Sequence, residues 1–190
     1  MTVALRTAMS LDEFLAWEER QEPRYEFDGV RAVAMVGGTA AHARITLNIA
    51  FALRGRLPSG CAVYASDLKL RLAGSIRYPD VMVVCSPVRN RATFVTDPVV
   101  VFEVLSERTS RTDRLVKSQE YGAAPSIARY VIVEQGSIGA TMFARPEFAR
   151  SDWRGQPLTG ADTVLPLPEI SVELRLGDCY AGLDLDAEAG

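Results

Sequence analysis

Nitrogen and sulfur ligands are scarce in this sequence. His42 is the only histidine, and the three cysteines, Cys61, Cys85 and Cys179, lie far apart. These few ligands argue against a zinc site made of His and Cys side chains. An odd number of widely spaced cysteines also argues against a disulfide framework, so we expect reduced and mostly buried thiols.

Familiar catalytic and nucleotide-binding motifs are missing as well. The sequence has no Walker loop, no Gly-x-Gly-x-x-Gly and no Gly-x-Ser-x-Gly elbow. Their absence removes the usual signatures of P-loop NTPases, dinucleotide-binding proteins and α/β-hydrolases. Carboxylates, in contrast, are plentiful, and together with water and carbonyl oxygens they suit Mg²⁺ or Mn²⁺.

Long hydrophobic runs are also lacking. No apolar run approaches the ~20 residues that cross a bilayer. The opening "MTVALRTAMS" lacks an apolar segment long enough for a secretory signal. We therefore expect a cytoplasmic protein without a membrane partner. The net charge of −3 disfavours general coating of nucleic acid. The net charge does not exclude a local basic groove, because Arg108, Arg111, Arg114 and Lys117 lie within ten positions of the sequence.

The remaining composition is that of a globular protein. With 190 residues, 48% of them hydrophobic and 24% charged, the chain is long enough to bury a sizeable core. We expect one domain over residues 1–190. Its core covers about 9–145, a C-terminal hairpin and packing segment covers 146–182, and a frayed acidic tail covers 183–190.

Local patterns predict helices that alternate with groups of strands. Helices are expected over 10–20, where Ser10 and Glu13 form a capping box, over 40–57 and over 110–122. The predicted strands cover 24–36 (two strands around a tight turn), 61–72, 76–84, 97–105, 129–134 and 139–144, followed by a hairpin at 151–165 and a final strand and short helix. This order predicts an α/β or α+β fold, with a mixed β-sheet flanked by helices and extra β-hairpins.

Two of the predicted strands carry an acid inside an apolar run. Asp80 follows Pro79 in "IRYPDVMVV", and Glu103 lies within "VVVFEVL". A buried carboxylate is costly unless it is paired or bound to a cation. If both acids point to one side of neighbouring strands, they form a site for a divalent cation.

An ordered set of motifs resembles a known family. The set consists of "RYEFDGV", a helix that begins near His42, "YPDVMVV" and "FEVLSERTSRTDRLVKSQEY". Over roughly residues 9–145 the chain is similar to the Uma-type endonuclease family of the PD-(D/E)XK, restriction-endonuclease-like superfamily. The resemblance implies a Mg²⁺- or Mn²⁺-dependent nuclease that hydrolyses phosphodiester bonds, with DNA as the expected substrate.

The resemblance also implies roles for particular residues. Asp80 and Glu103 would bind the metal, with the backbone carbonyl of Val104 as a third ligand. Two residues after Glu103 the parent pattern has a lysine, whereas this chain has Leu105. The resemblance transfers the lysine's role, positioning the attacking water, to Lys117. With the early acid of "RYEFDGV" added, the predicted catalytic residues are Asp80, Glu103, Lys117 and Glu26.

Each predicted acid has a structural alternative. Asp80 could cap a turn after Pro79, Glu103 could form a buried ion pair with an arginine, and Glu26 could be an ordinary exposed strand residue.

The other polar candidates also have structural alternatives. Lys117 could pair with Asp113 on a helix surface, while Asp113 itself suits a helix N-terminus. Tyr121 could only pack, and His42 could be a partly buried polar residue near a helix start.

Two alternatives concern the whole protein. It could be a catalytically silent nuclease-fold module that binds a partner or nucleic acid, as the Leu105 departure suggests. It could also be a structural dimer. We expect a homodimer, because the apolar hairpins after residue 128 offer a dimer surface.

Overall fold

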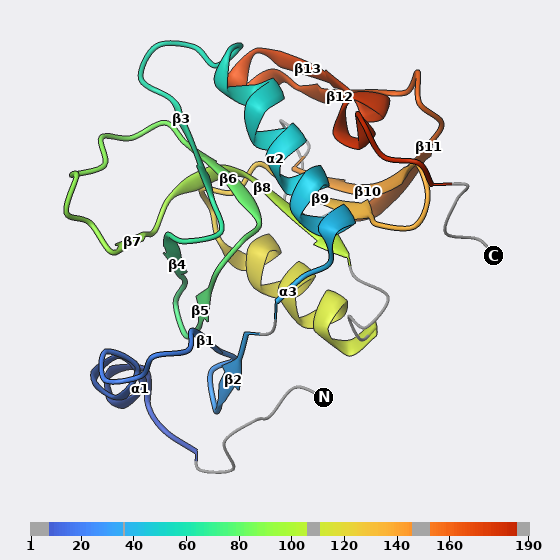
Figure 1. The fold of residues 1–190 in the computed structure, drawn as a ribbon. Helices are drawn as coiled ribbons and strands as arrows, with labels where there is room; N and C mark the ends of the chain where they lie inside the picture. Colours follow the sequence, from blue (N-terminus) through green and yellow to red (C-terminus); the bar gives the residue numbers. More distant parts are fainter. Residues whose placement is uncertain (1–7, 36, 106–110, 146–152, 186–190) are drawn as a thin grey trace.

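The computed structural model describes residues 8–35, 37–105, 111–145 and 153–185 (Figure 1). Within them the chain forms a mixed α+β fold, as predicted. The helical elements are α1 (Leu11–Glu18), α2 (Ala40–Arg54), α3 (Arg111–Ala123) and the 3₁₀ turns η1 (Pro168–Ile170) and η2 (Leu176–Tyr180).

The main sheet is mixed and has the strand order β11-β10-β9-β8-β6-β3. Strands β8 and β9 run parallel, while the other neighbours in this sheet are antiparallel. Its strands are β3 (Ala62–Ala65), β6 (Val81–Val84), β8 (Pro98–Leu105), β9 (Arg129–Glu134), β10 (Gly139–Ala144) and β11 (Gly155–Thr159).

Two smaller sheets accompany it. One has the order β2-β1-β5-β4-β7, and the other is the antiparallel pair β12-β13. The strands are β1 (Tyr25–Phe27), β2 (Ala32–Ala34), β4 (Lys69–Arg71), β5 (Ile76–Arg77), β7 (Phe94–Val95), β12 (Val164–Leu167) and β13 (Val172–Arg175).

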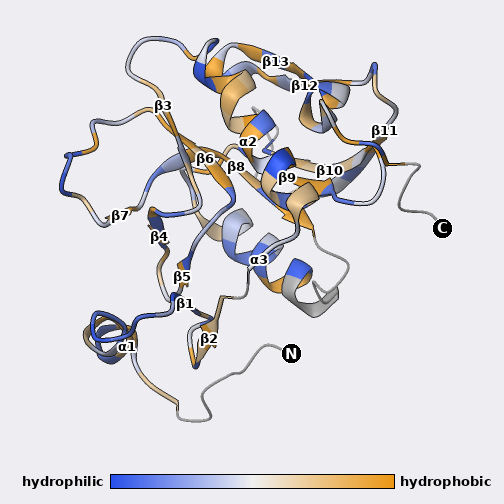
Figure 2. Cartoon of the chain, viewed as in Figure 1, coloured by the Kyte–Doolittle hydropathy of each residue, from blue (hydrophilic) through white to orange (hydrophobic). Residues whose placement is uncertain are grey.

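Alternation along β6 and β8 divides the core between the two faces of the main sheet. Ile45, Ile49 and Leu53 of α2 pack with one set of strand residues and with β12 and β13. Tyr121 of α3 packs with the other set. Helices α2 and α3 therefore cover opposite faces, and the central strands are the most hydrophobic part of the ribbon (Figures 1 and 2).

Helix α1 packs on the smaller sheet through Phe14, which stacks on Phe27. Its predicted capping box is present. The Ser10 side chain accepts from the backbone of Glu13, and the Glu13 carboxylate accepts from the backbone of Ser10.

Two of the strand predictions are wrong in extent. Segment 61–72 contains β3 and β4, and segment 76–84 contains β5 and β6; in both cases the two strands belong to different sheets. In the second segment the break falls at Tyr78–Asp80, where Pro79 has no N–H for a ladder. In the first, Ser66 adopts a positive φ of 55°. Apolar runs indicate burial, but they do not show where a chain crosses between sheets.

The predicted hairpin at 151–165 is also wrong in its pairing. Strand β11 pairs with β10, whereas β12 pairs with β13. The two-residue strand β7 was not predicted, because two residues leave no periodic pattern. The final short helix is present as the 3₁₀ turn η2.

The expectation of three reduced cysteines is wrong. Cys61 and Cys85 form a disulfide, and Cys179 is free and buried. The antiparallel register that pairs Ala62 with Val84 brings the cysteines next to those residues face to face. The spacing of cysteines along the chain contains no information about this register.

In the described ranges, no helix combines the length and the apolar character that crossing a membrane requires. The hairpins after residue 128 pack mainly within the chain. Of the large hydrophobic side chains described there, Val164 is the exposed one. The predicted homodimer stays a prediction.

Candidate active site

Asp80 lies where the chain passes from the smaller sheet to the main sheet. Extending the pairing of Val81 with Phe102 by one residue places Asp80 opposite Glu103. By strand alternation Glu103 shares a face of β8 with Val101 and Leu105, which pack on the α3 side. The backbone N–H of Val104 donates to Oδ2 of Asp80 at 2.7 Å. The Pro-Asp pair therefore marks a crossing between sheets, and Asp80 is anchored to the neighbouring strand.

His42 contacts the same carboxylate. Its Nε2 lies 3.2 Å from Oδ2 of Asp80, and the Thr39 hydroxyl accepts from its backbone N–H at the start of α2. The hydrogen bond to Asp80 raises the pKa of His42, although burial opposes the shift. A Cβ on Gly38 would come within 2.9 Å of the His42 ring, so a side chain at this position would displace the ring. His42 is thus more than a partly buried polar residue near a helix start, because it contacts Asp80, an acid predicted for the site.

Glu103 is buried, with 8% of its surface exposed. Its Oε1 accepts from the Tyr121 hydroxyl at 2.8 Å and lies 3.3 Å from Nζ of Lys117. Burial raises the pKa of Glu103, and the negative charges of Asp80 and Glu26 add to this while Lys117 opposes it. The ion pair of Glu103 is formed with a lysine rather than with the arginine of the structural alternative.

Lys117 joins Glu103 to Glu26. Its Nζ lies 3.3 Å from Oε1 of each carboxylate, and its side chain is largely buried. The ammonium therefore points toward the acids, as the resemblance implies. The alternative partner, the side chain of Asp113, lies outside the described residues.

Glu26 is buried, so it is not an exposed strand residue. Its Oε2 lies 3.2 Å from Nη1 of Arg77, and its Oε1 accepts from the backbone N–H of Tyr78 at 3.2 Å. Burial favours the neutral acid, but the charges of Lys117 and Arg77 outweigh it and lower the pKa of Glu26. Glu26 is thus held as a carboxylate.

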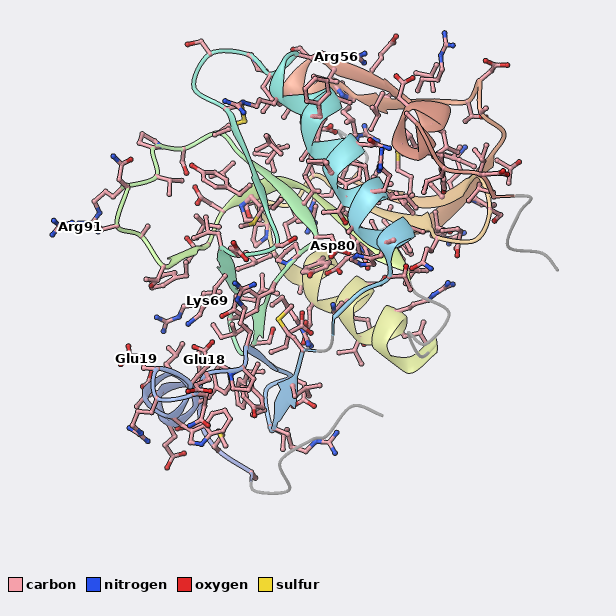
Figure 3. All side chains as sticks on the ribbon, in the orientation of Figure 1. Glu18, Glu19, Arg56, Lys69, Asp80 and Arg91 are labelled. Carbon is pink, nitrogen blue, oxygen red and sulfur yellow. A yellow bond between two sulfur atoms is a disulfide. The ribbon has the colours of Figure 1, made fainter. Side chains whose placement is uncertain are left out.

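A cavity of about 900 Å³ connects these groups. In Figure 3, Asp80 lies between α2 and α3 at the centre of the molecule. The basic side chain of Arg114 also lines the cavity. Of the residues that line the cavity, the sequence singled out Glu26, His42, Asp80, Glu103, Val104, Leu105, Arg114 and Lys117.

The charges of this connected group are unbalanced. Contacts link three of its four carboxylates to two permanent cations, and the fourth, that of Asp80, contacts His42. The carboxylates are Glu26, Asp80, Glu103 and Glu120, and the cations are Arg77 and Lys117. Within this group the carboxylates outnumber the permanent cations, while Arg114 adds a positive charge to the cavity lining. In the described part of the chain, no three His, Cys, Asp or Glu side chains are grouped closely enough to hold a metal by themselves.

Sequence patterns did not assign four members of this connected group, which are Tyr121, His42, Arg77 and Glu120. The positions of Tyr121 and His42 along the chain do not reveal a carboxylate partner, and no expected site residue corresponds to Arg77 or Glu120. An arginine next to apolar Ile76 in a predicted core strand is a signal that could have found Arg77, because a buried guanidinium requires acidic partners.

Comparisons with known proteins identify the family. Residues 11–177 match the model of Uma2, which is described as a putative restriction endonuclease. The match continues beyond residue 145, where the resemblance seen in the sequence ends.

Two relatives come from Synechocystis, and both are described as uncharacterized proteins. The protein slr1290 is 31% identical over 179 residues, covering 92% of this chain and 93% of the relative. The protein sll1609 is 29% identical over 141 residues, covering 71% and 80%.

The fold is also found in a solved structure. A crystal structure of a protein from Anabaena variabilis, described as a putative nuclease belonging to DUF820, aligns with a TM-score of 0.76 and 15% identity. The alignment covers 91% of this chain and 98% of that one. With the match over residues 11–177, the chain belongs to the Uma2 family, in the restriction-endonuclease-like superfamily.

Proposed function

We propose that this protein is a Mg²⁺- or Mn²⁺-dependent endonuclease that hydrolyses phosphodiester bonds in DNA. The family supports a nuclease function in general. The observation that carries the finer proposal is that Asp80 from the bend before β6, Glu103 from β8 and Lys117 from α3 line one cavity. Two acids and a lysine are the groups that metal-assisted hydrolysis of a phosphodiester requires.

The residues present fit a divalent cation. Asp80 and Glu103 offer carboxylate oxygens from adjacent positions. The N–H and C=O of one strand residue point toward the same neighbouring strand. Because the N–H of Val104 donates to Asp80, the carbonyl of Val104 is directed toward the side where Asp80 lies. Mg²⁺ is commonly bound by one or two carboxylates and completes its shell with water, so a third acid is not needed.

The chain's own groups then divide the chemistry. A divalent cation, when bound, lowers the pKa of a water and neutralises charge at the phosphate. The ammonium of Lys117 lies next to Glu103, where it can orient the attacking water and stabilise the developing anion. His42 holds the carboxylate of Asp80 in place through its Nε2.

Glu26 takes a supporting role in this proposal. Its two oxygens already contact Lys117, Arg77 and the backbone of Tyr78. A cation would have to displace one of these contacts. We therefore assign Glu26 to the placement of Lys117 rather than to the metal.

Lys117→Ala tests the proposal directly. It should abolish nicking of plasmid DNA in Mn²⁺ at low salt but preserve Mn²⁺ binding in calorimetry, because the ammonium is not a ligand. Lys69→Ala is the matched control. Lys69 is the only other lysine, and it pairs with Glu18 away from the cavity. Equal nicking by the parent and by Lys117→Ala would contradict the role of Lys117.

The alternative is a silent module that binds nucleic acid or another partner. The observation in its favour is Leu105 at the position where the parent pattern has a lysine. This alternative predicts that the parent protein retains DNA in a filter-binding assay but cleaves none with Mg²⁺ or Mn²⁺. The contact between Lys117 and Glu103 weighs against it, because a lysine reaches the acid from the following helix.

A further inference from the structure

Arg77 lies behind the proposed site and is 2% exposed. Its Nε and Nη2 each lie 2.7 Å from one oxygen of Glu120 on α3. Its Nη1 lies 3.2 Å from Oε2 of Glu26 on β1. One guanidinium thus bridges the helix and the smaller sheet with three hydrogen bonds.

These contacts form a chain of alternating charges that begins and ends on α3. Lys117 contacts Glu26, Glu26 contacts Arg77, and Arg77 contacts Glu120. Glu120 follows Lys117 by three positions on the same helix, so the two lie on one side of it. Helix α3 therefore carries both ends of this chain, Lys117 and Glu120, and the smaller sheet carries its middle.

We propose that Arg77 and Glu120 are positioning residues that fix the ammonium of Lys117 beside Glu103. The effect of this positioning on catalysis rests on the proposed endonuclease function. A lysine side chain is a flexible stem that carries a point charge, whereas the planar fork of arginine fixes a carboxylate in two places. Locking Glu26 and α3 to one guanidinium removes the freedom that Lys117 would otherwise have.

Stability alone explains this arrangement poorly. The cost of removing charges from water often cancels the attraction within a buried ion pair. The two-point contact with Glu120, in contrast, fixes the guanidinium of Arg77, whose Nη1 then holds Oε2 of Glu26 while the other oxygen, Oε1, contacts Lys117.

The placement of Lys117 can be measured without metal or DNA. The chain contains two lysines, so protein labelled with ¹⁵N at the lysine side chains gives two ammonium signals. Lys69, paired with Glu18, is an internal reference. We expect Glu120→Gln and Arg77→Lys to speed hydrogen exchange of the Lys117 ammonium by about tenfold and leave Lys69 unchanged.

Glu169→Gln is the matched control. It breaks another arginine–carboxylate pair, in which Nε of Arg129 lies 2.8 Å from Glu169, outside the cavity. It should change thermal stability without changing the Lys117 signal. If Arg77→Lys fails to fold, Glu120→Gln decides, because it keeps the shape of a partly exposed side chain.

Cleavage kinetics provide a second readout. Glu120→Gln should lower kcat by about tenfold, since small displacements of a catalytic group are costly. The KM for DNA and the affinity for Mn²⁺ should stay within about twofold, because neither depends on a displaced ammonium. A purely structural ion pair would lower the melting temperature without this separation of kcat from KM.

The outcomes separate the two proposals. If Glu120→Gln and Arg77→Lys leave the exchange of the Lys117 ammonium as it is in the parent, the positioning role is wrong. If the parent cleaves no DNA but the exchange of Lys117 quickens in both variants, the positioning role stands and the endonuclease proposal falls.

Discussion

Glu103 is the residue whose substitution is most informative. It is buried, and its Oε1 contacts both Lys117 and the Tyr121 hydroxyl. Because burial already favours its neutral form, an uncharged amide of the same shape should be tolerated. The role of the charge can therefore be tested while the fold is kept.

Glu103→Gln should weaken Mn²⁺ binding by at least about tenfold, because a metal ligand loses its charge. Calorimetric titration measures the affinity, and circular dichroism verifies the fold. Unchanged binding would show that Glu103 is not a ligand. Unfolding of the variant would support an ion pair that is structural only.

The contact between Gly38 and His42 provides a second test. Gly38→Ala should displace the His42 ring from Asp80 and weaken Mn²⁺ binding by about tenfold, as changes behind a metal ligand do. Gly37→Ala is the matched control, because a Cβ there meets nothing within 4 Å. Similar affinities for the two variants would mean that His42 does not support Asp80.

Single residues differ in how far the sequence predicts their roles. An acid inside an apolar run is conspicuous, so Asp80 and Glu103 could be singled out from the residues alone. Lys117 depended on the resemblance. The partnership of Arg77 with Glu120 requires knowing that α3 lies against β5, and nothing in the spacing of the two residues shows this.

At the level of elements, the patterns predicted which segments are buried better than how they pair. The helix expected over 40–57 is present as α2, and the strand expected over 97–105 is present as β8, because each has a clear hydrophobic period. Crossings between sheets were not predicted. They depend on single residues such as Pro79, whose effect is visible only when the neighbouring strands are known.

The disulfide between β3 and β6 leads to a prediction at this level. Alkylation of denatured, unreduced protein should label one cysteine, Cys179, and alkylation after reduction should label all three. Reduction should lower the free energy of unfolding by about 3 kcal/mol, because the bond closes a loop of 24 residues. Labelling of three cysteines without a reductant would contradict the bond.

The same experiment bears on location. Disulfides are uncommon in cytoplasmic proteins, so the expected cytoplasmic location and this bond do not agree easily. Alkylation of protein quenched in acid directly from cells would show whether the bond is formed there.

For the whole molecule, the expected homodimer can be tested by mass. Phe51 on α2 is 80% exposed, and Leu47, one turn earlier, is exposed and lines the cavity. Exposed apolar side chains of this size favour association. Light scattering at micromolar concentration should therefore give twice the 20.8 kDa of one chain. A mass of one chain would contradict the dimer.

The crossing of the chain between two sheets at Asp80 also has a consequence during protein synthesis. The ribosome makes Glu26 on β1 first, then Asp80 just before β6, then Glu103 on β8 and finally Lys117 on α3. The main sheet cannot form around Glu103 until β9 has been added. A nascent chain that stops before β9 therefore lacks the completed site, and the proposed activity would begin only after β9 has been made.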